Sequence, residues 1–106
     1  MIITTSEQIE GRRVKRVLGL VRGNTIRTRH LGKDIMAGLR GVVGGEVPEY
    51  TKLFAESREQ AIDRMVEEAE SIGADAVVGV RLTTSMVMTT AAELLAYGTA
   101  VQLEDL

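Results

Sequence analysis

The chain has no cysteine, one histidine, one proline and only three aromatic residues in 106 positions. Without cysteine it can form no disulfide, no thiolate nucleophile and no cysteine-based zinc or iron–sulfur centre. The aromatic residues, Tyr50, Phe54 and Tyr97, are too few to build a hydrophobic core. The sequence therefore predicts a core made of aliphatic side chains.

Long hydrophobic runs are missing as well. No apolar stretch approaches the roughly 20 residues that cross a bilayer as a helix. Residues 1–16 carry charges with no continuous apolar segment behind them, unlike a secretory signal. We therefore expect a cytoplasmic protein with no membrane partner. Its length corresponds to one domain, residues 1–106.

The charges are distributed unevenly along the chain. Lysine and arginine number 13 against 15 acidic residues, yet nine of the 13 lie within residues 1–40. This asymmetry fits charge pairing between subunits as well as a basic binding face. Nucleic-acid binding is disfavoured, because no aromatic residue interleaves the arginines and the pI is near 5.4.

The hydrophobic pattern predicts an α+β fold. Apolar residues at helical spacing predict helices over 33–43 and 49–72, the second ending at Gly73. Gly23-Asn24 is a turn signal at the end of the first long strand. A short β-prone segment opens the chain, and the expected long strands cover 11–25, 75–85 and 93–104. The predicted order is β-α-α-β-β, a small mixed sheet with two helices on one face.

Within this sheet we expect the first long strand to run parallel to the strand after the helices. The last two strands should form an antiparallel hairpin. The uncharged runs Val17–Val21 and Ala76–Val80 indicate strands covered on both faces, whereas the helices cover one. Other copies of the chain are the obvious cover for the second face, so we expect a homo-oligomer built sheet to sheet, closing into a ring or barrel.

Three segments carry a family resemblance: "IMAGLRGVVGGEVPEYTK", "EEAESIGADAVVGVR" and "ELLAYGTAVQLE". With "MIITT" and "IEGRRV" they resemble the YbjQ-like family, small bacterial and archaeal proteins labelled "putative heavy-metal-binding". The resemblance covers nearly the whole chain and implies a dodecin-like subunit, a homopentamer and a bound divalent or heavy-metal ion. The family commonly has a basic residue after the paired glycines, where this chain has Glu46, so an anion site based on a positive charge there is in doubt.

The segment Ala37–Lys52 holds four of the eleven glycines and the only proline. Exposed backbone amides at the start of the following helix could bind phosphate. No phosphate-loop motif is present, however, and the neighbouring glutamates would repel an anion. The favoured interpretation is a corner between two helices, although this corner remains the best place to look for a ligand. The candidate ligand-binding residues are Arg40, Gly44, Gly45, Glu46 and Tyr50.

His30 and Glu46 are the candidate metal ligands. One imidazole per chain is not a metal site, but copies of His30 could converge in a ring or meet a neighbour's carboxylate. Met86 and Met88 could offer thioethers to a soft ion, although packing against a neighbour is the favoured interpretation. The carboxylates of residues 67, 68 and 70 fit a solvated helix face better than a metal site.

The sequence leaves three classes of function open. The first hypothesis is a non-enzymatic homopentamer that binds a heavy metal or small ligand at subunit interfaces. The alternative is an enzyme with an intersubunit active site. It is disfavoured because no G-x-S-x-G motif occurs and His30 is the only imidazole base. The third is a nucleic-acid-binding module.

Overall fold

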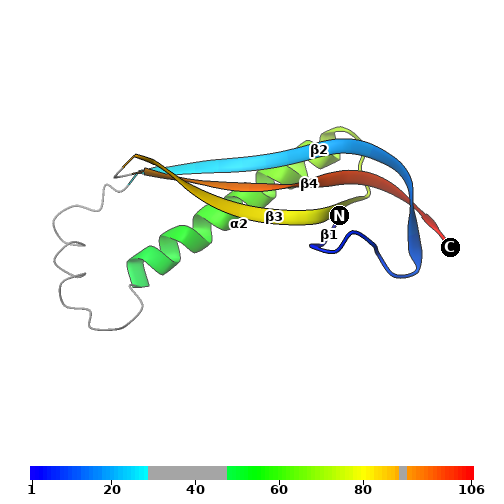
Figure 1. Ribbon diagram of the computed structural model, residues 1–106, viewed down its shortest axis with the longest axis horizontal. Helices are drawn as coiled ribbons and strands as arrows, with labels where there is room; N and C mark the ends of the chain where they lie inside the picture. The colour runs from blue at the N-terminus through cyan, green and yellow to red at the C-terminus, as the bar shows by residue number, and fades with distance from the viewer. Residues whose placement is uncertain (29–47, 89–90) are drawn as a thin grey trace.

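The computed structural model describes residues 1–28, 48–88 and 91–106. Four strands form one mixed sheet in the order β1-β3-β4-β2, and a long helix lies against it (Figure 1). The elements are β1 (Ile2–Ile3), β2 (Arg12–Thr28), α2 (Pro48–Ser71), β3 (Ala76–Met88) and β4 (Ala91–Asp105).

The predicted β-α-α-β-β fold with two helices is wrong. Within the described residues the order is β-β-α-β-β, with one helix, and the helix expected over 33–43 lies outside them. The expected parallel pair is also wrong, because β2 pairs antiparallel with β4. The parallel partner of β3 is the two-residue strand β1, which takes the place beside β3 that the first long strand was expected to fill. The antiparallel hairpin of the last two strands is confirmed.

Gly23-Asn24 is not a turn; it lies well inside β2. A Cβ atom at Gly23 would overlap the backbone carbonyl of Ala61 and the backbone amide of Met65, both on α2. Glycine is needed here because the helix backbone rests directly on the strand. The same residue that signals a turn in the sequence therefore permits close packing in the fold.

Helix α2 begins and ends within a residue of the predicted 49–72. Its C-terminus is a Schellman motif: Gly73 has φ +79° and donates its N–H to the Glu70 carbonyl at 3.1 Å. The N–H of Ala74 reaches the Ala69 carbonyl, also at 3.1 Å. These two bonds satisfy carbonyls that the helix end would leave without partners. Ile72, the last residue of the predicted helix, lies just beyond the end of α2 and is exposed.

The core is aliphatic, as predicted. Ala61, Met65 and Ala69 of α2 are fully buried against one face of the sheet, which we call the inner face. The sheet residues in this cluster are Val21, Val77, Val80, Ala96 and Ala100.

Within residues 1–28, 48–88 and 91–106, the opposite, outer face is covered only at one end, where Ile9 packs on a second cluster of Ala76, Val78, Val101 and Leu103. Backbone hydrogen bonds from Thr4 to Val77 and from Gly79 to Ser6 hold the N-terminal segment there. The described part of the chain thus covers more of the outer face than the sequence suggested, but not all of it.

The molecule is long and thin, with principal extents of 56 × 24 × 16 Å. Its radius of gyration is 17.5 Å, against about 13 Å for a compact domain of this length. Among the described helices, none is long and apolar enough to cross a membrane. Because the strands extend along this long axis, the single described helix does not cover them over their whole length.

Replacing Gly23 with alanine should destabilise the protein by about 1–3 kcal/mol, because the added methyl must push α2 away from β2. The free energy of unfolding in urea, at matched protein concentration, measures the effect. Asn24→Ala is the control, since Asn24 is the exposed neighbour on the same strand. Equal stability of Gly23→Ala and the wild type would contradict the close contact.

Candidate functional site

Most predicted site residues fall where the structure gives no description. His30, Arg40, Gly44, Gly45 and Glu46 all lie in the segment 29–47, outside the described residues. Tyr50 belongs to the first turn of α2, but its side chain is not described. The glycine-corner site and the His30/Glu46 metal site therefore stay predictions.

Within the described ranges, no group of three or more histidine, cysteine, aspartate or glutamate residues could hold a metal ion. Glu67, Glu68 and Glu70 are exposed on α2, which confirms the solvated helix face. Met86 and Met88 are both exposed on β3, and the register with β4 shifts between them. The described residues of one subunit thus supply no complete metal site.

The described chain does carry an unusual amount of exposed apolar surface. On the outer face of β2, Val17 is 63%, Leu20 64% and Ile26 58% exposed. We call these three residues the outer patch. They alternate with inward-facing residues such as Val21, which is fully buried beneath α2. A glycine bulge at Gly19, φ +123°, keeps Val17 and Leu20 on one face despite their odd spacing.

A second apolar surface is a groove on the inner face, between α2 and β3. Its volume is about 430 Å³, and its lining is Phe54, Arg58, Leu82, Thr84 and Leu94. Leu82 is 45% exposed, and Met86, further along β3, is 59% exposed. The helix crosses the sheet obliquely (Figure 1), and its burial decreases toward its N-terminus. Among the residues that the structure describes, no helix is therefore packed tightly over the distal half of β3.

Polar side chains join α2 to β2. Arg27 Nε donates to Ser57 Oγ at 2.7 Å, and the Arg27 guanidinium also donates to Gln60. The Thr25 hydroxyl donates to the Ser57 carbonyl at 3.2 Å, and Arg64 Nη1 donates to the Asn24 carbonyl at 2.6 Å. These bonds set the helix position and leave the groove open. Sequence analysis assigned Arg27 to a basic segment and missed this role, since only the fold brings it to Ser57.

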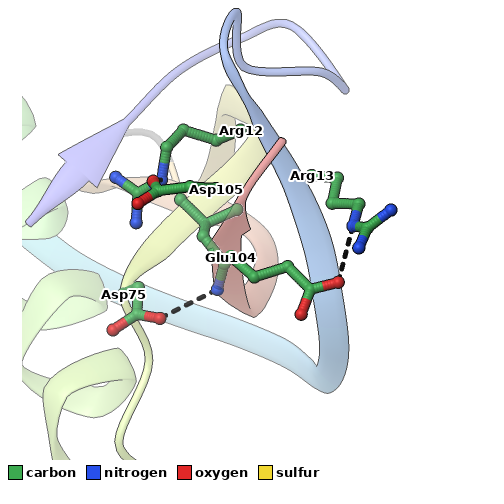
Figure 2. A network of polar contacts seen from close by, with 6 residues as sticks. Arg12, Arg13, Asp75, Glu104 and Asp105 are labelled. Carbon is green, nitrogen blue, oxygen red and sulfur yellow. Dashed lines mark hydrogen bonds and ion pairs between the residues drawn. The ribbon is translucent and has the colours of Figure 1, made fainter.

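The basic residues at the start of β2 have partners in the same subunit (Figure 2). Arg12 Nε lies 3.1 Å from Asp105 Oδ1, and Arg13 Nε lies 2.6 Å from Glu104 Oε1. Asp75 Oδ2 accepts the Leu103 N–H at 2.8 Å, which joins the start of β3 to β4. The positive charges of Arg12 and Arg13 are therefore paired with carboxylates at the end of β4, the antiparallel neighbour of β2, and do not form a free basic face.

Beside these ion pairs is a pocket of about 530 Å³, lined by residues 7–14 with Val78, Leu103 and Leu106. Both of its arginines face carboxylates, and Glu7 and Glu10 add negative charge. Such a lining offers no uncompensated positive charge to an anion. The groove and the outer patch are therefore stronger candidates for a binding surface than this pocket.

Comparison with known proteins shows to which family the chain belongs. The chain matches the sequence model of the YbjQ_1 family, described as "Putative heavy-metal-binding", over residues 1–104. This chain belongs to the YbjQ_1 family. The family resemblance seen in the sequence segments is thereby confirmed.

YbjQ_1 relatives are found in archaea and bacteria. The chain is 62% identical over 103 residues to a UPF0145 protein of Methanosarcina acetivorans, covering 97% of each chain. It is 53% identical over 106 residues to a UPF0145 protein of Thermotoga maritima, with full coverage of both. A crystal structure of a protein of unknown function from Pediococcus pentosaceus has a TM-score of 0.68 at 17% identity, covering 98% of each chain. At this identity, the likeness shows a shared fold and nothing about function.

Ser57→Ala should lower the free energy of unfolding by roughly 1.5–3 kcal/mol, because a buried hydroxyl that accepts from a guanidinium is lost. Urea denaturation measures the change. Gln60→Ala is the matched control: it removes the other side-chain partner of Arg27, but that bond is exposed, so the loss should be smaller. A larger loss for Gln60→Ala would show that Ser57 does not anchor the helix.

Proposed function

We propose that this protein is a non-enzymatic homo-oligomeric binding protein of the YbjQ_1 family, holding a heavy-metal ion or small ligand between subunits. One observation carries the proposal: the described subunit leaves large aliphatic side chains exposed on both faces of its sheet. Apolar clusters of this kind mark interaction surfaces in soluble proteins. The cytoplasmic location expected from the sequence stays a prediction.

The size of the exposed surface supports association. Burying apolar surface contributes about 25 cal/mol per Å². Val17 and Leu20 alone are each more than three-fifths exposed, and β3 adds the exposed side chains of Leu82 and Met86. The elongated shape points the same way, because a thin subunit has much surface for its volume. A pentamer is the assembly implied by the family resemblance, and we propose that number.

The metal part of the proposal draws on the family description and on symmetry. The described residues of one copy provide no three-residue ligand group. In a ring, each ligand is repeated in every subunit, so one or two donors per chain can make a full coordination sphere. His30 and Glu46 remain the proposed donors, with Arg40, Gly44, Gly45 and Tyr50 as the proposed lining for a small ligand.

Native mass spectrometry tests assembly and binding together. We expect a multiple of the 11.5 kDa chain, five copies, that gains mass when Zn²⁺ or Cd²⁺ is added. A monomer that carries nothing at any metal concentration would contradict the proposal.

The double variant His30→Ala/Glu46→Gln is the control for the ligands. It should keep the oligomer and lose the added metal mass. If it retains the metal, these two residues are not the ligands, although the assembly stands.

A further inference from the structure

We propose that the groove between α2 and β3 binds a small amphipathic carboxylate of the fatty-acid class, with its aliphatic tail along β3 and its carboxylate on the Arg58 guanidinium. The groove is lined by Phe54, Arg58, Leu82, Thr84 and Leu94. This site lies within one subunit and shares no residue with the ligand sites proposed above. It therefore does not rest on the proposed assembly.

The strand side of the groove is one row of side chains on the inner face. Leu82 pairs with Ala96, and Thr84 pairs with Leu94. Paired residues in a sheet share a face, as do residues two apart on a strand. Ala96 is fully buried in the inner-face core. The whole row therefore lies on the side of the sheet that α2 covers.

The helix side of the groove is formed by Phe54 and Arg58. They are four residues apart on α2 and are therefore neighbours on its surface. Because α2 crosses the sheet obliquely (Figure 1), a groove of about 430 Å³ remains between these side chains and the strand row. Sites for small molecules are typically about 300–1,000 Å³, mostly apolar, with a few polar groups that orient the ligand.

The apolar part of the lining suits an aliphatic tail. Phe54 and Leu82 form opposite walls, and Leu94 is buried between them on β4. The strand row continues past the groove to Met86, which is 59% exposed. From Leu82 to Met86 the strand rises about 13 Å. A flexible hydrocarbon chain can follow this row, and binding would remove both exposed side chains from water.

The charge of the groove favours an anionic head group. Among the described residues that line it, Arg58 alone is charged. Arg58 Nε lies 3.6 Å from Glu59 Oε1, but both side chains are at least half exposed, and such a pair is weak. A guanidinium offers paired N–H donors that match the two oxygens of a carboxylate. The Thr84 hydroxyl adds one more donor to the lining.

Isothermal titration calorimetry with sodium decanoate, kept below its micelle concentration, tests the site. The wild type should bind one decanoate per chain. Arg58→Ala should weaken binding about tenfold or more, because the carboxylate loses its charged partner. Acetate, which has no tail, should not bind. Decylammonium and decanol, which have the tail without the carboxylate, should bind at least about tenfold more weakly than decanoate.

Arg22→Ala is the matched control. Arg22 is an exposed arginine of β2 that pairs with Tyr97 on the outer face, so its loss changes the net charge equally without touching the groove. It should bind decanoate like the wild type. Arg58→Lys keeps the charge but not the paired donors, so its affinity should lie between those of Arg58→Ala and the wild type. Circular dichroism and thermal melting verify that each variant is folded.

Methyl NMR locates the bound decanoate, and the largest shifts should fall on Leu82, Thr84 and Leu94. Equal affinity of Arg58→Ala and the wild type, or of decylammonium and decanoate, would overturn the proposed carboxylate site. Absence of saturable binding would overturn it as well. If the Leu82 and Leu94 signals then change with protein concentration, a second copy occupies the groove instead. None of these outcomes alters the mass gained with Zn²⁺ or Cd²⁺, which tests the proposed function separately.

Discussion

The close contact of α2 with β2 at Gly23 is the constraint on which the rest of the structure depends. No side chain separates the helix backbone from the strand there. The helix residues that meet the sheet are accordingly small or flexible, namely Ala61, Met65 and Ala69. Because the helix and the sheet approach so closely, small aliphatic side chains such as alanine and valine fill the space between them. The chain therefore needs few large side chains in its core and has only three aromatic residues.

Because α2 lies over β2, it leaves part of β3 uncovered on the same, inner face of the sheet. Hydrogen bonds from Arg27 and Arg64 hold α2 in position, so it cannot also cover the distal half of β3. The groove follows from this arrangement, since the helix diverges from β3 while the strand continues to Met88. On the outer face the N-terminal segment covers only one end. The open surfaces are thus consequences of how the core is built.

The sequence predicted features that depend on local pattern. The long helix, its end at Gly73, the aliphatic core and the final hairpin follow from apolar periodicity and turn chemistry, and all were confirmed. The partners of β1 and β2 were not predicted, because a periodic pattern marks a segment as a strand without saying which other strand it pairs with. The turn predicted at Gly23 was wrong for a physical reason. In a single sequence, a glycine that lets a helix approach a strand cannot be distinguished from a glycine that makes a turn. The predicted His30 and glycine-corner sites lie outside the described residues, and the outer patch and groove could not be located without the fold.

The sequence pattern and the structure disagree on how far the segment Val17–Val21 is buried. An uncharged strand segment predicts burial on both faces, yet in the subunit only Val21 and Leu18 face the core, while Val17 and Leu20 are exposed. The hydrophobic pattern of a chain reflects burial in its working state, whether the cover comes from the same chain or from another copy. Where pattern and subunit structure disagree in this direction, the difference marks surface that the subunit alone does not bury. Val17 and Leu20 show this mismatch on the outer face of the sheet, where both are more than three-fifths exposed.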